Sequence, residues 1–374
     1  MAFTPFDLEF TQSKWEQQVD INLTESGVHP RRLDELLGDD RASVDDLLRT
    51  EINYPHVNGN PVLRERIAAL YDGAGIDNVL VTVGAAEANN IIMQTLMEPG
   101  DELATQTPTY LQVWGLARNA GHEANTFSLR PENGWALDVD ELDANVNERT
   151  RVIAVCNPNN PTGYILTDAE MDAVVAAADR VGAWILADEV YRGAERLREE
   201  ETPSFYGRYD KVLALGSMSK AYGLPGLRVG WVVGPPQTIE DLWRRHEYTT
   251  ITASMLSNVL AAHALSPDVR PRLIERTRNY IRNGFPVLEQ WMQGQGGLFS
   301  YTPPQASAVS FIRYHLELNS TALMEKLCRE ASVFVGAGDS FGMDHHLRIA
   351  FGQPREVLEE AFARIGKSLA KLAA

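Results

Sequence analysis

The sequence predicts an α/β protein in which helices cover both faces of a mainly parallel sheet. Between about Asn78 and Gly234, short apolar runs alternate with segments of helical periodicity. These runs are apolar throughout, which is typical of strands that are buried on both faces of a sheet. Beyond Pro267 the pattern changes to a long arginine-rich helical stretch and two further apolar runs. That change predicts a second, smaller α+β unit.

The expected elements can be placed by residue range. We expect strands of the main sheet at 79–83, 102–106, 152–156, 184–188, 212–216 and 229–233, with helices at 87–97 and 168–181. In the second unit we expect a helical stretch over 269–292 that is broken near Gly284-Phe285-Pro286, strands near 308–312 and 347–351, and a helix from about Pro354. Ligands bind at the carboxyl ends of the strands in such sheets, so polar motifs there are candidates for a functional site.

Two domains are expected, because 374 residues exceed the usual size of a single hydrophobic core. We predict a large domain over 45–270 and a small domain formed by 1–44 together with 271–374. The first 40 residues are rich in turn-forming residues and do not fit the pattern of the large domain. They are therefore assigned to the small domain.

The composition argues against several classes of protein. With 34 Lys and Arg against 51 Asp and Glu, the formal net charge is −17, which repels nucleic acid and anionic membrane surfaces. No apolar run is long enough to span a bilayer, and the N-terminus lacks a secretory pattern. Cys156 and Cys328 allow no disulfide framework, and no cluster of His and Cys suggests a metal. We expect a cytoplasmic protein without metal, nucleic acid or membrane partner.

The most informative segment is 217–228, which reads SMSKAYGLPGLR. Lys220 follows the apolar run 212–215, where burial lowers the pKa of the amine and leaves it neutral, so that it can form a Schiff base with an aldehyde. Arg228 begins the next expected strand and offers a planar fork for a phosphate. Aldehyde and phosphate together indicate pyridoxal 5'-phosphate (PLP). The alternative is an ordinary lysine at a strand end and a surface arginine.

Two loops at strand ends supply further candidates. Gly84 lets the backbone approach an anion, and the amides of Ala85 and Ala86 at the following helix start are suited to a phosphate, although many such turns carry a glycine for structural reasons alone. In the segment 157–163, NPNNPTG, two prolines restrict the preceding asparagines. The amide of Asn160 can thus be held rigidly over the strand ends, where it could bond a ring oxygen.

Three more side chains fit a flat cofactor. Asp188 ends the apolar run 184–187, where an ionised carboxylate needs a positive partner such as a protonated pyridine nitrogen. Tyr191 could reach the phenolic oxygen of the ring, and Tyr110, at the start of an expected helix, could stack on its face. An ordinary helix-cap aspartate and a core tyrosine are the alternatives.

In their order and spacing these motifs resemble the fold-type I PLP-dependent enzymes, specifically the class I and II aminotransferases, from about Tyr54 to Arg348. The resemblance implies PLP as the cofactor and a mainly parallel, seven-stranded sheet between helices beside a smaller α+β domain. It implies that Lys220 is the Schiff-base lysine and the proton shuttle, and that Asp188 pairs with the ring nitrogen. It also implies that Asn160 and Tyr191 contact the ring oxygen and that Tyr110 stacks on the ring. Arg348 would bind the substrate α-carboxylate, and Asn160 would also lie at the substrate. The implied phosphate contacts are Ala85, Ala86, Ser217, Ser219 and Arg228.

The same resemblance implies a homodimer, because Tyr54 matches a family tyrosine that reaches the phosphate of the neighbouring subunit. The N-terminus departs from the family pattern: in 23–30, LTESGVHP, Gly27 could still approach the substrate carboxylate, but Glu25 is an unusual neighbour. A weaker resemblance to capreomycidine synthase, a family member that cyclises a hydroxylated arginine, covers this N-terminal region together with 129–135 and 246–250.

The resemblance implies an aminotransferase that moves the amino group of a free L-amino acid to a 2-oxo acid through Lys220. One alternative keeps the cofactor and ends in elimination or cyclisation of a hydroxylated arginine. Another is a non-catalytic PLP-binding regulatory module, for which the acidic charge and the lack of an added DNA-binding segment leave little room. Glu25 and Glu247 favour a basic or neutral substrate over aspartate, provided that both line the pocket.

Overall fold

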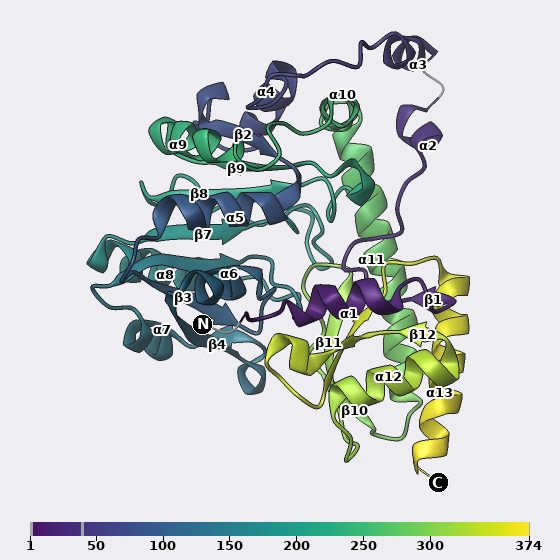
Figure 1. Ribbon diagram of the computed structural model, residues 1–374. Coiled ribbons are helices and arrows are strands. Elements are labelled where there is room, and N and C mark those ends of the chain that lie inside the picture. Colours follow the sequence, from purple (N-terminus) through teal and green to yellow (C-terminus); the bar gives the residue numbers. More distant parts are fainter. Residues whose placement is uncertain (1–2, 39–40, 374) are drawn as a thin grey trace.

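The computed structural model describes residues 3–38 and 41–373 (Figure 1). Within these ranges, eight strands form one sheet in the order β2-β9-β8-β7-β6-β3-β4-β5. The strands are β2 (Val79–Thr82), β3 (Glu102–Thr107), β4 (Glu123–Arg130), β5 (Ala136–Leu137), β6 (Thr150–Cys156), β7 (Trp184–Asp188), β8 (Val212–Ser217) and β9 (Gly230–Val233). All neighbours from β8 to β4 are parallel, whereas β9 is antiparallel to β8 and β2. The α/β fold is confirmed, and the short antiparallel β5 adds an eighth strand to the seven expected.

Both faces of the large sheet are buried, because successive side chains of each strand enter different apolar clusters. On β7, Leu186 packs in the same cluster as Ile91, while Ile185 and Ala187 belong to the cluster that contains Val174. The first face is covered by α5 (Gly84–Leu96), α6 (Gln112–Ala120) and α9 (Pro236–His246). The second is covered by α4 (Pro61–Ala68), α7 (Val139–Asn145), α8 (Asp168–Val181) and α10 (Met255–Ala264).

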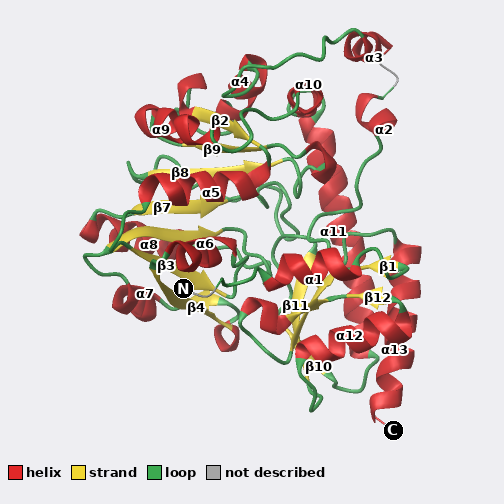
Figure 2. Cartoon of the chain, in the orientation of Figure 1, coloured by secondary structure: helices red, strands yellow, loops and turns green. Residues whose placement is uncertain are grey.

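A second, antiparallel sheet lies beside the first in the order β10-β11-β14-β13 (Figure 2). Its strands are β10 (Phe299–Tyr301), β11 (Val309–Tyr314), β13 (Gly336–Ala337) and β14 (His346–Ala350), and its helices are α11 (Arg270–Gln293), α12 (Ser320–Ala331) and α13 (Arg355–Ala373). The short 3-10 helices are η1 (Ile76–Asn78), η2 (Pro131–Asn133), η3 (Pro225–Leu227) and η4 (Gly338–Phe341). None of the helices described is both long and apolar enough to cross a membrane.

The first part of the N-terminal segment, up to β1, packs on this second unit. The elements of the whole segment are α1 (Asp7–Trp15), β1 (Ile21–Asn22), α2 (Leu33–Leu37) and α3 (Arg41–Leu48). Strand β1 pairs in parallel with β12 (Val333–Phe334), and α1 contacts β13 and η4. Figure 1 shows α3 at the outer edge of the molecule, beyond α10. The division into domains at 44/45 and 270/271 stays our proposal.

The expected break of the long helix near Gly284 is wrong, because α11 continues through Pro286. A proline removes one main-chain hydrogen bond of a helix, but buried neighbours can hold the helix together. Phe285 and Leu288 are both buried in the core. At Gly284 a Cβ atom would lie 1.8 Å from the carbonyl oxygen of Phe351, so the glycine serves close packing against the segment after β14 rather than a helix end.

Candidate active site

One cavity of about 420 Å³ gathers side chains from the carboxyl ends of the large sheet's strands, from β14 and from the N-terminal segment. Most of the residues that the sequence singled out line it together: Ala85, Ala86, Tyr110, Asn160, Asp188, Tyr191, Ser217, Ser219, Lys220, Arg228 and Arg348. These residues lie far apart in the chain and meet because the strand ends converge at one edge of the sheet.

One end of the cavity offers donors for an anion. Helix α5 begins at Gly84 without a side-chain cap on Val83, so the amides of its first turn lack intrahelical partners. Gly84 has a φ of 75°, and a Cβ atom there would lie 2.4 Å from Arg228 Nη2. Glycine is therefore required both for the backbone conformation and for the close approach of the guanidinium. The result is a positive concavity suited to a phosphate.

Two serines complete this end of the site. Ser217 Oγ donates a hydrogen bond to Ser219 Oγ at 3.0 Å, and Arg228 Nη1 donates to Ser219 Oγ at 3.3 Å. Arg228 was expected to begin a strand, but it follows η3 in the left-handed conformation with a φ of 49°, and β9 starts at Gly230. A second bond from Nη1 to the carbonyl of Pro225 at 3.1 Å helps to fix this conformation.

Asp188 ends β7 and has no cationic partner among the described residues; it accepts one hydrogen bond, from the Val190 amide at 3.2 Å. Burial raises the pKa of its carboxyl to about 6, because the charged form is poorly solvated there. A protonated ring nitrogen would provide the missing positive charge.

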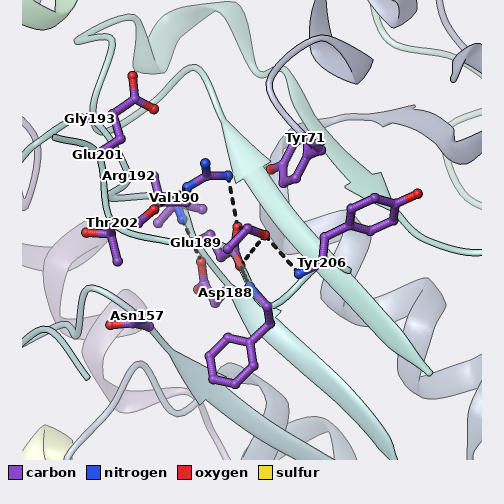
Figure 3. Close-up of polar contacts among 12 residues, drawn as sticks. Tyr71, Asn157, Asp188, Glu189, Val190, Arg192, Gly193, Glu201, Thr202 and Tyr206 are labelled. Carbon is purple, nitrogen blue, oxygen red and sulfur yellow. Dashed lines mark hydrogen bonds and ion pairs between the residues drawn. The ribbon is translucent and has the colours of Figure 1, made fainter. Parts of the chain in front are cut away.

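The segment after β7 is fixed by a neighbouring buried carboxylate, that of Glu189 (Figure 3). It accepts from Arg192 Nη1 at 3.2 Å and from Ser204 Oγ and the Phe205 amide, both at 2.8 Å. The Arg192 guanidinium also lies over the Tyr71 ring, 5.1 Å from its centroid. Because Asp188 and Tyr191 flank this anchored stretch, their backbone positions are set before any ligand binds.

Lys220 follows β8, and among the described residues its side-chain amine makes no hydrogen bond or ion pair. Burial lowers the pKa of its amine, which favours the neutral, nucleophilic form. The backbone beside it is closely packed: a Cβ atom on Gly27 would lie 3.1 Å from the Ser219 carbonyl oxygen.

Two tyrosines line the cavity with their hydroxyls engaged. Tyr191 is buried and donates to Ser26 Oγ at 2.8 Å. Tyr110 donates to Glu9 Oε1 at 2.8 Å, and Phe6 meets its ring edge to face with centroids 4.9 Å apart. Helix α6 begins at Gln112, so Tyr110 precedes the helix rather than starting it. Burial raises the pKa of both phenols, so both are neutral donors.

Arg348 on β14 is buried at the opposite side of the cavity. Its Nη1 donates to Asn160 Oδ1 at 3.0 Å and its Nη2 to the Thr24 carbonyl at 2.7 Å, while Nε has no partner among the described residues. Among the described residues no carboxylate forms an ion pair with Arg348, so its charge stays available for an anionic group.

Several lining residues were missed by the sequence analysis. They are Glu9, Gln12, Thr24, Ser26, Asn89 and Gln112. Gln112 Nε2 donates to the Ala86 carbonyl at 3.0 Å, and Gln112 Oε1 accepts from Asn89 Nδ2 at 2.9 Å, so this pair braces the first turns of α5. Glu9 and Gln12 reach the cavity because α1 docks beside it, whereas Thr24 and Ser26 follow β1, which pairs with β12.

Three residues considered from the sequence do not line this cavity. Gly27 packs against the backbone of Ser219 and Lys220. Tyr54 is 78% exposed, and Glu247 at the end of α9 is also exposed. Glu247 therefore does not line the cavity of the single chain. Among the described residues, no group of His, Cys, Asp and Glu side chains could hold a metal ion.

Comparison with known proteins agrees with this geometry. The family model for class I and II aminotransferases matches residues 42–365. Capreomycidine synthase of Streptomyces vinaceus is 33% identical over 94% of this chain and 90% of its own, and arginine–pyruvate transaminase of Pseudomonas aeruginosa is 29% identical over 89% and 86%. A PLP-dependent aminotransferase from Streptococcus suis superposes with a TM-score of 0.93 at 29% identity, covering 100% of this chain and 99% of its own.

The chain belongs to the class I and II aminotransferase family. It is a PLP-dependent enzyme of fold type I. The cavity fits the cofactor: an uncapped helix start beside Arg228 suits the phosphate, an Asp188 without a cationic partner suits the ring nitrogen, and an unpaired Lys220 amine suits the aldehyde.

Proposed function

We propose that this enzyme moves the amino group of a free L-amino acid to a 2-oxo acid. The observation that carries the proposal is that Lys220, Asp188 and Arg348 line one cavity. When bound, PLP supplies an aldehyde for the amino group and a positively charged ring that accepts electrons from the substrate α-carbon. The chain's own residues bind both molecules and move the proton.

The binding roles divide along the cavity. The Ala85 and Ala86 amides, Ser217, Ser219 and Arg228 would hold the phosphate. Asp188 would keep the ring nitrogen protonated, and Tyr110 would stack on the ring. Asn160 Oδ1 already accepts from Arg348, which leaves its Nδ2 donor for the ring oxygen beside Tyr191. Arg348 would bind the α-carboxylate of the substrate.

Lys220 would move the proton. Its neutral amine takes the proton from the α-carbon of the donor, and its position on the backbone beside Gly27 limits where the flexible side chain can deliver that proton. Removing this base should lower the rate by about 10²–10⁴-fold.

We further propose a homodimer in which Tyr54 reaches the partner's site. The support is a set of exposed apolar side chains in two adjoining segments: Leu48, Ile52, Tyr54, Tyr248 and Ile251. Thr252 Oγ1 donates to the His56 carbonyl at 3.5 Å, so the two segments lie side by side. A surface of this kind is typical of a subunit interface.

The test is a panel of amino acids incubated with the PLP-loaded enzyme, with and without 2-oxoglutarate or pyruvate, and products identified by mass spectrometry. We expect an oxo acid to form from the donor only when an acceptor oxo acid sustains turnover. Lys220→Ala should slow it by about 10²–10⁴-fold, while Lys211→Ala, just before β8 and outside the cavity, should not.

A second candidate is cyclisation or elimination of a hydroxylated arginine, favoured by the 33% identity with capreomycidine synthase. Consumption of a γ-hydroxylated arginine without any oxo acid, with a cyclic product, would replace the proposed transamination.

A further inference from the structure

Two carboxylates line the same cavity as Lys220 and Arg348, and neither is paired with a positively charged side chain of the described residues. Glu9 comes from α1 and Glu25 from the loop after β1. Tyr110 donates to Glu9 Oε1 at 2.8 Å, and Gln12 Nε2 donates to Glu25 Oε1 at 2.6 Å. Among the described residues neither carboxylate forms an ion pair, and the Oε2 atom of each makes no hydrogen bond.

The charges of the cavity do not balance once the proposed roles are filled. Arg228 is matched by the phosphate, Asp188 by the ring nitrogen and Arg348 by the substrate α-carboxylate. Lys220 is neutral when it acts as a base. The Glu9 and Glu25 charges then remain, and burying part of such a charge without a partner is costly.

We infer that the side chain of the amino acid donor is cationic and that Glu9 and Glu25 bind it. This inference rests on the proposed function, because it takes Arg348 as the site of the α-carboxylate. The buried Arg348 leaves Nε unpartnered, so the cavity holds a cation and two carboxylates that form no ion pair with one another. A free amino acid with a positively charged side chain is complementary to that pattern.

The electrostatic effect of Glu9 and Glu25 on the cations of the cavity agrees with this inference. Burial lowers the pKa of the Arg348 guanidinium, and the negative charges of Glu25 and Glu9 act in the opposite direction. The same two carboxylates partly offset the effect of burial on the pKa of Lys220. Both carboxylates therefore lie close enough to Lys220 and Arg348 to affect the pKa of each.

No cation in the cavity is left for a second carboxylate of the substrate. The positively charged lining residues are Lys220, Arg228 and Arg348, and each already has a role. Aspartate and glutamate would place a further negative charge near Glu9 and Glu25, which disfavours both as donors.

The two carboxylates should not contribute equally. Glu9 is exposed, so water screens its charge, whereas Glu25 is only partly exposed. We expect Glu25 to carry most of the selectivity. Gln12 and Tyr110 act as positioning residues, since each holds one oxygen of a carboxylate and leaves the other free.

The test compares pairs of donors with nearly the same shape that differ in charge: L-arginine with L-citrulline, and L-lysine with L-norleucine. For the wild-type enzyme we expect kcat/KM to favour each cation by about tenfold or more, as one charge-assisted hydrogen bond implies. Glu25→Gln should reduce the preference to near unity, mainly because kcat/KM falls for the cationic donors. Glu9→Gln should reduce the preference less.

The matched control is Glu356→Gln on α13, which removes the same charge from an exposed position outside both the cavity and the proposed dimer interface. Its preference should equal that of the wild type. Equal use of arginine and citrulline by the wild type, or an unchanged preference in Glu25→Gln, would overturn the inference.

Equilibrium titration of the PLP-loaded enzyme with the same amino acids, without an oxo acid, separates this inference from the proposed function. Tighter binding of arginine than of citrulline without oxo-acid formation from any donor would support the inference and refute transamination. Oxo-acid formation that is fastest with aspartate would support transamination and overturn the inference. Failure of arginine and lysine both to bind and to react would overturn the inference.

Discussion

Arg348 on β14 donates a hydrogen bond to Asn160 after β6 at 3.0 Å, and this contact joins the second sheet to the carboxyl edge of the first. Both residues were predicted for the site, although 188 positions separate them in the chain. The partner of the guanidinium is a neutral amide rather than a carboxylate, so the contact orients Arg348 without cancelling its charge. Its orientation is therefore fixed before substrate binds.

Arg348→Lys should weaken binding of every amino acid donor. A lysine keeps the positive charge but loses the planar fork that can hold a carboxylate through two parallel hydrogen bonds. We expect kcat/KM to fall by about 10- to 100-fold, mainly through a higher KM, because the contact is present in both the ground state and the transition state. Steady-state kinetics with two donors of different side chain would measure it.

The control is Arg313→Lys on the neighbouring strand β11, where the side chain is exposed. It should leave KM unchanged. An unaltered donor KM in Arg348→Lys would show that another group binds the α-carboxylate.

Asp188→Asn should make the cofactor-free protein more stable near neutral pH. Burial raises the pKa of Asp188 to about 6 in the folded protein, above its value of about 4 when unfolded. The folded state then binds the extra proton, so the free energy of unfolding falls as pH rises between about 4 and 6. The full effect is about 3 kcal/mol, and an amide, which does not ionise, avoids it.

Urea unfolding of the cofactor-free proteins at pH 5 and pH 7.5 would measure this effect. The stability difference between Asp188→Asn and wild type should grow by about 1–3 kcal/mol between these pH values. Asp72→Asn, at an exposed position, should follow the wild type. In the PLP-loaded enzyme the same substitution should instead slow α-proton exchange, and wild-type exchange rates there would contradict the pairing with the ring nitrogen.

The strand-end motifs of the site could be predicted from the sequence because each depends on local chemistry. Asp188 ends a buried strand, Lys220 and Asn160 lie in the loops just beyond two others, and the geometry of a parallel sheet then brings them together. Glu9 could not be found in this way. It reaches Tyr110, 101 positions away, only because α1 docks beside the cavity, and α1 carries little amphipathic signal of its own.

Local rules also failed where packing outweighed them. Pro286 and Gly284 predict the end of a helix, yet close packing against Phe351 keeps α11 continuous. Arg228 reads as part of a strand, but its side chain must reach the Gly84 turn, and the residue adopts a left-handed conformation instead. In each case the deciding contact is with a residue distant in sequence.

Ile52→Asp should dissociate the proposed homodimer. Ile52 is 86% exposed in the single chain, and burying such a side chain stabilises an interface by about 1.5–3 kcal/mol. A buried aspartate would remove this contribution and add a desolvation cost, so the dissociation constant should rise by at least about tenfold. Light scattering of the wild type should give about twice the chain mass of 41.5 kDa.

The matched control is Leu197→Asp, since Leu197 is also exposed, at 63%, but lies in the segment after β7. It should remain dimeric. A wild-type protein that is monomeric and fully active would contradict both the dimer and the role of Tyr54 at the partner's site.

Glu87 and His246 form a buried pair that fixes the start of α5. His246 Nδ1 lies 3.0 Å from Glu87 Oε1, and Glu87 Oε2 accepts from the Val83 amide at 2.6 Å. The hydroxyls of Thr249 and Thr250 also donate to Oε1. Burial alone would raise the pKa of Glu87, but these hydrogen bonds outweigh it and lower the pKa to about 2.

Glu87→Gln should therefore destabilise the protein by about 1–3 kcal/mol at neutral pH, because an amide cannot accept all of these bonds. A carboxyl with a lowered pKa stabilises the fold above about pH 4.5 and loses that contribution as pH falls towards 2, so the difference from wild type should shrink in that range. Glu98→Gln, exposed beyond the end of α5, is the control and should change little.

Because Ala85 and Ala86 share the first turns of α5 with Glu87, the Glu87→Gln variant should also release PLP more readily, as dialysis followed by absorbance would measure. Unchanged cofactor retention together with lost stability would limit the pair to a structural role.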